Sequence, residues 1–441
     1  MKDADKPVLE PRWAELSSKK DEAGYEAALH CNRCGFCTSF CPTYLATGDE
    51  GRSPRGRNQT FRALLEGRLK DPVQGGDLFD TCLLCGICTS VCFAEVPTAK
   101  LMSAAREKVM QRAGEPWLMR GLLRSLLPRP RLFEFFLQVL FWGKRLGVSR
   151  ALNRLGVLGL LDRRLAAAEE LTDSVPRRFL RDLLPNAPPD VDVVQFVACG
   201  PSYAMPAVGE ATHRLVRAAG KSVGRVDNVC CGLPALSLGD SAAARVLAEK
   251  NIAELEKYPR AVVLADDSSC AATLKEYPSL FEEGEWRRRA EAVSRRTKDL
   301  SEWLAENRPT GTPLPPTVVT YHDPCKARYG QKIVDAPRAL LAATPGVDYR
   351  ELPEADQCCG GGGTYSFLQP EISRQVLSRK IRNIESTGAA VVLTSAVSCL
   401  LQIRAGLKWT GSRVRAFHLS EFLSPPPASD ETGFFGPKTG L

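Results

Sequence analysis

Sixteen cysteines in four regularly spaced groups constrain this 441-residue chain more than any other feature of its sequence. Two groups share the spacing C-x2-C-x2-C-x3-C and comprise Cys31, Cys34, Cys37 and Cys41, then Cys82, Cys85, Cys88 and Cys92. The other two groups contain a single cysteine, a Cys-Cys-Gly triplet and a second single cysteine, and comprise Cys199, Cys230, Cys231 and Cys270, then Cys325, Cys358, Cys359 and Cys399. No cysteine is left over, so two internal duplications account for all of them.

The cysteines are expected to bind metal rather than to form disulfides. The opening residues, MKDADKPVLEPRWAEL, contain no apolar segment like that of a signal peptide, so we expect the chain in the reducing cytoplasm, where disulfides are rare. The sequence has no run of about eighteen apolar residues, so no transmembrane helix is expected. The net charge of +8 is mild and the basic residues are not interleaved with aromatic ones, so no nucleic-acid partner is expected.

The first two groups have the spacing with which one loop binds three corners of a cubane iron–sulfur cluster. In two-cluster ferredoxins the fourth cysteine of each run binds the other cluster. We therefore assign one 4Fe–4S cluster to Cys31, Cys34, Cys37 and Cys92, and a second to Cys82, Cys85, Cys88 and Cys41. Gly35 and Gly86 follow the second cysteine of each run, where a missing Cβ lets backbone amides approach the cluster. The alternative is a pair of zinc knuckles, although these usually use two separated C-x2-C pairs.

About forty residues between the two runs, including FRALLEGRLKD, show helical periodicity. Residues 1–111 therefore resemble the α-helical two-cluster ferredoxin module of respiratory iron–sulfur subunits more than a small free ferredoxin. One departure is Phe93, which replaces the proline that usually follows the fourth cysteine. Because two clusters with interlocked ligands must lie close together, this domain is expected to conduct electrons.

The last two groups are expected to lie on two small α/β units. Apolar, β-branched runs precede the single cysteines, as buried parallel strands do: VDVVQFVA, AVVLADD, TVVTYHDP and AAVVLTSAVS. The segments SAAARVLAEKNIAELEKY and PEISRQVLSRKIRNIEST show helical periodicity. The cysteines would then lie at the carboxyl ends of strands, where open α/β sheets place their sites. Proline-rich segments at 185–190 and 309–316 mark boundaries, which gives repeats over 191–308 and 317–424 and an unstructured tail over 425–441.

The Cys-Cys-Gly triplets suit metal binding for a geometric reason. Adjacent cysteines on a sharp turn can offer two thiolates to neighbouring irons, and the glycines at 360–363 would let backbone amides approach sulfide. The spacing of these glycines matches no phosphate-binding loop, so a nucleotide is not expected there.

The doubled triplet behind a two-cluster ferredoxin module resembles the cysteine-rich CCG-domain iron–sulfur proteins. These include the iron–sulfur subunit of glycolate oxidase, the lactate-utilisation iron–sulfur proteins, the C subunit of anaerobic glycerol-3-phosphate dehydrogenase and the D subunit of heterodisulfide reductase. The resemblance covers nearly the whole chain and is carried by CGFCTSFCPTYLATGDEGRSPRGR, SSCAATLKEYPSLF and CCGGGGTYSFLQPEIS. It implies one or two further iron–sulfur clusters, held by the cysteines of residues 191–424, beside the two 4Fe–4S clusters of the ferredoxin domain.

The chain departs from heterodisulfide reductase subunits at two positions. Those subunits carry C-x-x-C after each triplet, which gives five cysteines per site and a non-cubane cluster. Here Asp267 and Ala396 replace the first cysteine of that pair, so four cysteines remain in each copy. The sequence leaves open whether these sites hold cubane clusters, non-cubane clusters or, in one of them, zinc.

Several other polar residues stand near the cysteines in the sequence. His322, three residues before a predicted ligand, is expected to satisfy the end of a strand, with a hydrogen bond to a cluster thiolate or proton transfer as the alternative. The same roles are open to His30, whereas His213 and His418 are expected to be structural. Three arginines of GRSPRGR either form a solvated turn or act on an acidic partner or on the cluster potential: Arg52, Arg55 and Arg57.

Residues 112–190 are expected to form a basic helical linker. From Trp117 to Leu165 the sequence has many arginines, only Glu134 and Asp162 as acids, and an apolar segment, LFEFFLQVLFW, too short to span a bilayer. This pattern is typical of a helix at a membrane interface, which would place the protein peripherally at the inner face of the cell membrane, near a quinone pool. The alternative is an arm packed on the cysteine-rich domain or on a partner subunit. The expected fold class is thus an N-terminal α-helical ferredoxin domain, a helical linker and two pseudo-symmetric α/β repeats.

The sequence predicts a subunit of an oxidoreductase rather than a complete enzyme, because it contains no flavin or nicotinamide fingerprint. The resemblance implies an electron-transfer subunit of a membrane-associated dehydrogenase of glycolate, lactate or another 2-hydroxy acid. An FAD-containing partner subunit would pass electrons to these clusters and onward to quinone or another acceptor. The alternatives are a heterodisulfide or thiol reductase with chemistry at a CCG-domain cluster, and a zinc-bound docking scaffold.

Overall fold

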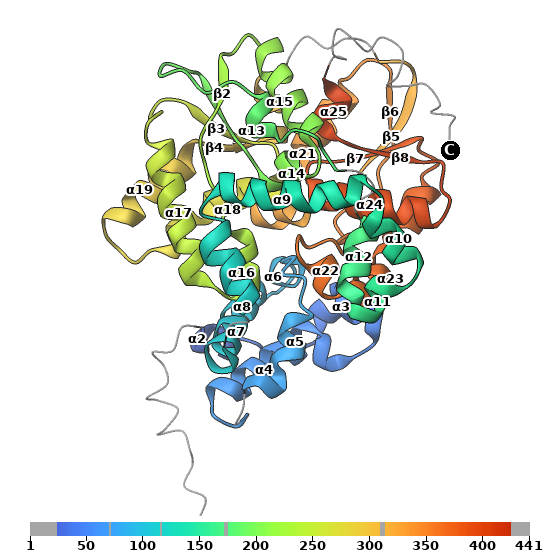
Figure 1. Cartoon of the computed structure of the whole chain (residues 1–441). Coiled ribbons are helices and arrows are strands. Elements are labelled where there is room, and N and C mark those ends of the chain that lie inside the picture. Colours follow the sequence, from blue (N-terminus) through green and yellow to red (C-terminus); the bar gives the residue numbers. More distant parts are fainter. Residues whose placement is uncertain (1–23, 70–71, 115–116, 172–174, 309–313, 425–441) are drawn as a thin grey trace, which may run out of the picture. The chain divides into compact units, whose positions relative to one another are not determined.

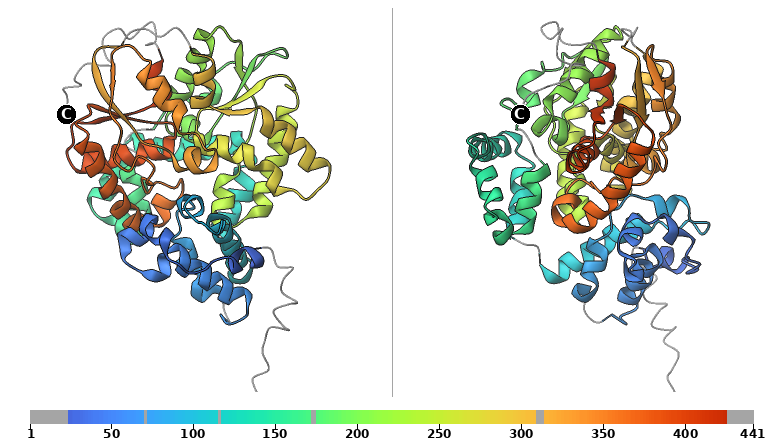
Figure 2. Two further views of the ribbon diagram at one scale, coloured as in Figure 1. Left: turned by 180° about the vertical axis from the view of Figure 1, so that it is seen from behind. Right: turned by 90° about the vertical axis from the view of Figure 1, so that its right-hand side faces the viewer.

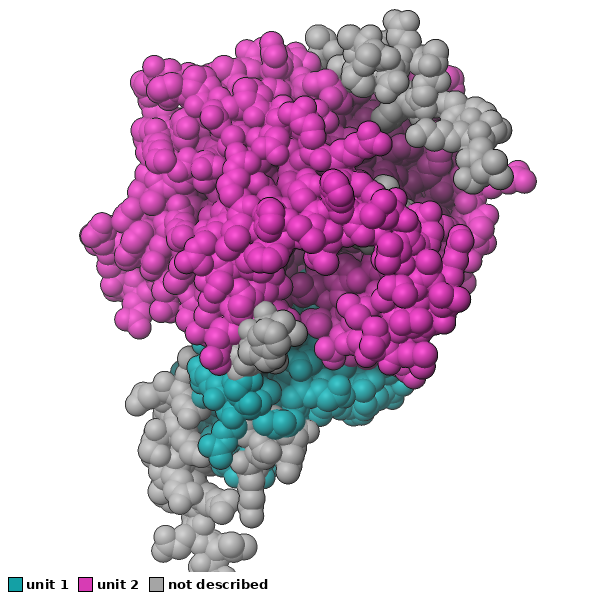
Figure 3. Space-filling model, in the orientation of Figure 1, with its two compact units in different colours: residues 1–115 teal, residues 116–441 magenta. Residues whose placement is uncertain are grey.

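The structure of the chain is a computed structural model that describes residues 24–69, 72–114, 117–171, 175–308 and 314–424 (Figure 1). The chain divides into two compact units, Met1–Glu115 and Pro116–Leu441 (Figure 3). The tail predicted over 425–441 and the opening residues on which the expected compartment rests lie outside the described residues.

Every secondary-structure element within the described residues of the first unit is a helix. Its elements are α2 (Tyr25–Leu29), η1 (Phe36–Phe40), α3 (Pro42–Thr47), η2 (Glu50–Arg52), α4 (Pro54–Leu65), η3 (Pro72–Gly75), α5 (Gly76–Asp80), α6 (Ile87–Ser90) and α7 (Thr98–Ala113). Helix α4 starts favourably, because the Ser53 side chain accepts a hydrogen bond from the Gly56 N–H and Pro54 occupies the first turn. The helices bury a core that includes Tyr25, Phe61, Phe79, Leu101 and Met102.

The second unit contains two parallel four-stranded sheets with the same topology. The first has the order β2-β1-β3-β4 and consists of β1 (Val193–Phe196), β2 (Val223–Arg225), β3 (Val262–Ala265) and β4 (Thr297–Asp299). The second has the order β6-β5-β7-β8 and consists of β5 (Thr317–Tyr321), β6 (Val347–Tyr349), β7 (Val391–Thr394) and β8 (Arg415–His418). In register, Val193 pairs with Val262, and Val319 pairs with Val391. The four strands predicted from apolar runs are therefore confirmed as the two central strands of each sheet.

Helices flank both sheets. Those of the first repeat are α14 (Cys199–Tyr203), α15 (Pro206–Ala218), α16 (Leu233–Leu238), α17 (Ser241–Leu255), α18 (Ser268–Glu276), η5 (Tyr277–Leu280), α19 (Glu285–Arg296) and α20 (Leu300–Glu306). Those of the second are η6 (Lys326–Gly330), α21 (Asp335–Ala342), α22 (Tyr365–Leu368), α23 (Pro370–Ser386), α24 (Val397–Trp409) and α25 (Leu419–Leu423). The two helices predicted from periodicity are confirmed as α17 and α23.

The two repeats share a hydrophobic core. It combines side chains from both sheets and their helices, among them Val193, Leu264, Trp303, Tyr321, Leu393 and Phe422. In addition, Ser420 of α25 donates a hydrogen bond from Oγ to the carbonyl of Val208 in α15 (3.0 Å). The repeats are therefore halves of one compact unit.

The basic segment forms an arm that packs on both repeats (Figure 2). Its elements are α8 (Trp117–Arg120), the π-helical turn η4 (Gly121–Leu126), α9 (Pro130–Arg145), α10 (Val148–Arg154), α11 (Val157–Leu161), α12 (Arg163–Leu171) and α13 (Leu180–Leu183). Arg124 pairs with Asp240 of the first repeat (2.9 Å), and Glu170 pairs with Arg374 of the second. Packing on the cysteine-rich repeats, one of the two interpretations of this segment, is thus confirmed. Among the described residues, no helix is both long enough and apolar enough to cross a membrane.

Candidate metal centres

The two C-x2-C-x2-C-x3-C runs fold into loops that change backbone handedness at the same positions. In each run, the residue before the second cysteine and the glycine after it have positive φ: Arg33 (58°) and Gly35 (80°), then Leu84 (51°) and Gly86 (86°). Such changes of handedness curl a loop around its own amide groups, and loops of this kind bind anionic groups, iron–sulfur clusters among them. The duplication is therefore present in the backbone as well as in the cysteine spacing.

The fold brings the eight cysteines of the first unit together in two crossed groups. The pKa of Cys37 is raised to about 11, mainly by burial and then by the nearby thiols of Cys31, Cys92 and Cys34. Burial also raises the pKa of Cys88, which lies close to Cys82, Cys41 and Cys37. Cys92 therefore lies with the first run and Cys41 with the second, and the two groups are adjacent. Thiols crowded in this way ionise together only around a cation, so the donor set fits a metal cluster.

The second group lines a small, partly open pocket, with Cys41, Cys82, Cys85 and Cys88 among its lining residues. Arg57 is buried at its edge, with Nη1 3.9 Å from the Sγ of Cys41 and 3.0 Å from the Oγ1 of Thr43. A fixed cation here would favour the reduced, more negative state of a cluster.

The other two arginines of GRSPRGR have different surroundings. Arg52 pairs with Asp77 (3.2 Å) and Arg55 pairs with Glu50 (2.6 Å). The guanidinium of Arg55 also lies against Gly35, within the first cysteine loop. Of the two interpretations of this segment, a role beside a cluster therefore fits Arg57 and Arg55, whereas Arg52 belongs to a surface ion pair.

The first cysteine group lies nearer to solvent than the second. Cys34 is exposed, whereas Cys41, Cys85 and Cys88 are buried. Phe93 is 86% exposed, and its ring centroid lies 5.1 Å from that of Phe36. The substitution of the usual proline by Phe93 thus adds an exposed aromatic side chain beside the first group and changes no cysteine.

In the second unit, each repeat places its four cysteines at the carboxyl edge of its sheet. Cys199 and Cys325 follow β1 and β5, and Cys270 and Cys399 lie at the beginnings of α18 and α24. The adjacent pairs Cys230-Cys231 and Cys358-Cys359 lie in the loops after β2 and β6. The predicted position at the carboxyl ends of the strands is therefore confirmed.

The thiols of each repeat lie next to one another in the same order. A hydrogen bond with Cys199 is the largest cause that raises the pKa of Cys230, and one with Cys358 does the same for Cys325. The thiol of Cys231 lies between those of Cys230 and Cys270, and the thiol of Cys359 lies between those of Cys358 and Cys399. Each repeat thus gathers four largely buried sulfur atoms, which suits iron–sulfur clusters and zinc alike. No disulfide occurs among the sixteen cysteines, all of which lie within the described residues.

The glycine after each cysteine pair is required by the backbone. Gly232 has φ of 95° and Gly360 has φ of 82°, values that side chains with a Cβ rarely adopt. A Cβ on Gly360 would also lie 2.6 Å from the carbonyl oxygen of Ser373. The Gly360 N–H donates a hydrogen bond to the Sγ of Cys358 (3.4 Å), so the turn brings a backbone amide to a cysteine sulfur.

Asp267 has a structural role in place of the cysteine that heterodisulfide reductases carry. Its Oδ1 accepts a hydrogen bond from the N–H of Ser269, at the start of α18 (2.9 Å). Its Oδ2 accepts a second from the N–H of Val397, at the start of α24 in the other repeat (2.9 Å). One carboxylate therefore caps two helices and links the two repeats.

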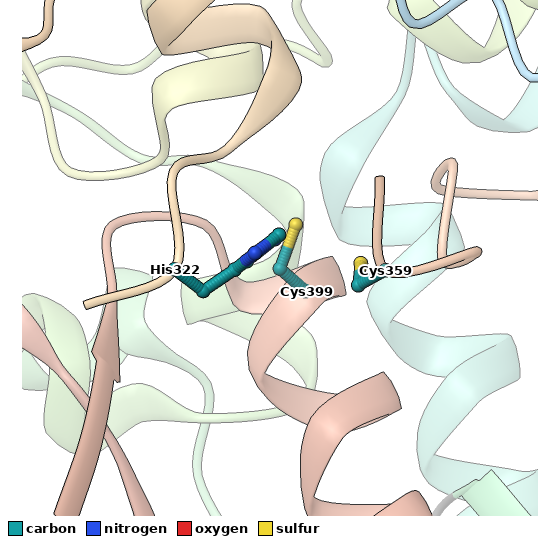
Figure 4. Close-up of side chains that lie close together, drawn as sticks. All are labelled: His322, Cys359 and Cys399. Carbon is teal, nitrogen blue, oxygen red and sulfur yellow. The ribbon is translucent and has the colours of Figure 1, made fainter. Parts of the chain in front are cut away.

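The four histidines have different surroundings. His30 is exposed, and His213 is buried within α15. His418 caps α25, because its Nδ1 accepts a hydrogen bond from the Ser420 N–H (3.2 Å), which confirms its structural role. His322 is fully buried, and one of its ring nitrogens lies within 4.8 Å of the sulfurs of Cys359 and Cys399 (Figure 4). Burial, followed by the charge of Lys380, holds the pKa of His322 well below its usual value.

Sequence reasoning missed Lys380, which is 1% exposed. Burial lowers the pKa of Lys380 to about 8, opposed first by the thiols of Cys359 and Cys358. Its ammonium donates to the backbone carbonyl of Glu354 and lies 3.4 Å from that of Ala355. A lysine inside the apolar stripe of PEISRQVLSRKIRNIEST was the signal available for it.

Comparisons with known proteins agree with these centres. A 4Fe-4S dicluster domain matches residues 27–96, and a cysteine-rich domain matches residues 193–275 and 319–404. A probable glycolate oxidase iron-sulfur subunit of Bacillus subtilis is 30% identical over 93% of this chain and 95% of its own length. The glycolate oxidase iron-sulfur subunit of Escherichia coli is 28% identical over 84% and 88%, and lactate utilization protein A of an Exiguobacterium species is 31% identical over 53% and 97%. The chain therefore belongs to the family of cysteine-rich, CCG-domain iron–sulfur proteins that includes these glycolate oxidase subunits and lactate utilization proteins.

Proposed function

We propose that this chain is the electron-transfer subunit of a flavin-dependent dehydrogenase complex that oxidises glycolate, lactate or a related 2-hydroxy acid. The observation that carries the proposal is the adjacency of the two crossed cysteine groups in the first unit, which suits stepwise electron transfer between two clusters. The names of the relatives support the class of acid. An FAD-containing partner subunit would oxidise the acid and deliver its two electrons one at a time to this chain, which passes them to quinone or another acceptor.

A gentle anaerobic pull-down of the full-length chain from the organism that makes it tests this function. We expect a flavoprotein to co-purify, and we expect glycolate or lactate to bleach the visible absorbance of the clusters in the complex. The purified chain alone serves as the control and should not respond to either acid. Absence of flavin from the complex, or clusters that stay oxidised when the acid is added to it, would contradict the proposal.

A heterodisulfide or thiol reductase is the second candidate function, since subunits of that class carry the same triplets. It requires a substrate sulfur to reach an iron in one of the repeats. Asp267 and Ala396, which occupy the positions of the fifth cysteines, are 6% and 0% exposed, and the carboxylate of Asp267 is engaged in two hydrogen bonds. This arrangement favours electron transfer over such chemistry. Anaerobic reduction of a small disulfide by the reduced, isolated chain would reverse that preference.

The proposed complex also contacts the membrane, through the outer side of the arm. Helices α9 to α11 expose a series of large apolar side chains, namely Phe135, Phe136, Val139, Leu140, Trp142, Leu146, Val148, Leu155, Leu160 and Leu161. Exposed arginines accompany them, among them Arg145, Arg150, Arg154 and Arg164. An amphipathic helical surface with aromatic and basic residues suits the interface of an anionic bilayer, which would bring the clusters to a quinone pool.

Vesicle sedimentation tests the membrane contact. We expect the full-length chain to sediment with vesicles of phosphatidylglycerol and phosphatidylethanolamine, and L140E/W142E to lower the bound fraction at least about tenfold, because each of these side chains contributes about 1.5–3 kcal/mol when buried. V246E is the control, since it places a glutamate at an exposed apolar position of α17, outside the arm. Equal binding of L140E/W142E and the unmodified chain would contradict a membrane contact through this surface.

A further inference from the structure

The two repeats can be compared position by position, because they share sheet order and cysteine spacing. The residue three positions before the first cysteine is Phe196 in the first repeat and His322 in the second. Phe196 is the last residue of β1, and His322 directly follows β5. Both side chains are fully buried. The repeats therefore place an apolar ring and a nitrogen-bearing ring at equivalent buried positions.

The two rings are buried in the same regions as equivalent pairs of cysteines. Phe196 belongs to the apolar core that contains Cys231 and Cys270. His322 lies with Cys359 and Cys399, and one ring nitrogen and the two sulfur atoms are all within 4.8 Å of one another (Figure 4). Since Cys231 corresponds to Cys359 and Cys270 to Cys399, only the second repeat adds a nitrogen donor to its sulfur atoms at this position.

No hydrogen bond from the described part of the chain compensates the burial of the His322 imidazole. Within the described residues, neither Nδ1 nor Nε2 makes a hydrogen bond. A buried polar group without a partner is destabilising, so such a group calls for a ligand that the protein atoms do not supply. The backbone of Ala355 acts on the ring in the direction of a hydrogen-bond acceptor, but neither ring nitrogen completes a hydrogen bond to it. Metal-binding histidines usually donate their second ring N–H to a backbone carbonyl or a carboxylate.

The repeats also differ in the polar residue that lies near the cysteine pair. Asn251 and Lys380 each lie eleven residues after the N-cap of the helix that follows the triplet, Asp240 for α17 and Gln369 for α23. Asn251 donates to the carbonyl of Cys230, whereas Lys380 places an ammonium beside Cys358 and Cys359. The site of the second repeat thus combines four sulfur atoms with an imidazole and a buried cation.

We propose that His322 binds, through a ring nitrogen, the metal that Cys359 and Cys399 bind, so that the second repeat holds a mixed nitrogen–sulfur centre and the first a sulfur-only centre. Imidazole binds iron and zinc, and both metals accept thiolates. If the metal is iron, a neutral imidazole and a nearby cation make the second centre easier to reduce than the first, as histidine ligation does in Rieske clusters. The ligand assignment does not depend on the proposed function.

Pulsed electron paramagnetic resonance on the full-length chain, purified anaerobically with ¹⁵N-labelled histidine, tests the ligand, together with iron and zinc contents. H322F copies the first repeat, and H322C substitutes a sulfur donor that preserves metal binding if H322F does not fold. H30Q is the matched control, because it removes the histidine next to Cys31 in the first unit. For iron, we expect a directly bound histidine nitrogen in the unmodified chain and in H30Q, and its loss in H322F and H322C.

For zinc, we expect about one zinc per chain, lost in H322F and retained in H322C and H30Q. The proposal is overturned if H322C keeps the nitrogen coupling. It is equally overturned if neither a nitrogen coupling nor the zinc content depends on His322. Loss of the flavoprotein partner would leave all of these outcomes unchanged, so the failure of the proposed function and the failure of this ligand are distinguishable.

Discussion

Alanine at Cys31 and Cys92 together should remove about four irons per chain, whereas alanine at Cys31 and Cys41 together should remove about eight. The reason is the crossed arrangement of the first unit, in which Cys37 lies with Cys31, Cys34 and Cys92, while Cys88 lies with Cys82 and Cys41. The first pair of substitutions removes two ligands of one cluster. The second pair removes one ligand from each cluster. Iron and acid-labile sulfide per chain, measured in anaerobic preparations, give both numbers.

The two variants control for each other, because each replaces two cysteines of the same unit. If each run held its own cluster, the results would be exchanged, with about eight irons lost from C31A/C92A and about four from C31A/C41A. The reduced form of C31A/C92A should also show the signal of one isolated cluster, without the magnetic coupling expected of two adjacent ones. Equal losses with a reduced helical circular dichroism signal would indicate that the unit unfolds and would contradict the prediction.

The features predicted correctly from the sequence are those with a local signal. The central strands β1, β3, β5 and β7 are runs of apolar, β-branched residues, because strands buried on both faces must be apolar throughout. The outer strands β2, β4, β6 and β8 have three or four residues, include charged ones, and were not predicted, since pairing with a neighbour decides their conformation. The location of the cysteines at the carboxyl edges of the sheets was predictable as well, because the single cysteines follow these apolar runs in the sequence.

The candidate site was predicted less completely, because its other residues act through contacts distant in sequence. Asp267 was interpreted only as the replacement of a cysteine, and its partner Val397 lies 130 residues away. His322 was singled out for its distance from Cys325, but a comparison with Phe196 was needed to show that the repeats differ there. The alignment of the two repeats thus carried information that neither repeat carries alone.

The bond from Asp267 to Val397 explains why Ala396 is tolerated at the start of α24. Alanine has no side-chain acceptor, and α24 has no cap from its own N-cap residue. The carboxylate of Asp267 supplies that cap from the other repeat while it also caps α18. At the two positions where this chain lacks the fifth cysteine, the Asp267 carboxylate therefore caps both helices and joins the repeats.

Replacing Asp267 with alanine should lower the free energy of unfolding by about 2–4 kcal/mol, because it leaves two buried N–H groups without acceptors. D267N should cost about half as much, since its amide oxygen can still cap α18 while its NH₂ group faces the N–H of Val397. The swapped variant D267A/A396D should recover much of the loss, because the repeats are related by pseudo-symmetry and an aspartate at 396 is the N-cap residue of α24. Urea unfolding, followed by circular dichroism under anaerobic conditions, gives this order of stabilities. Equal stability of D267A and the unmodified chain would show that this carboxylate does not hold the two repeats together.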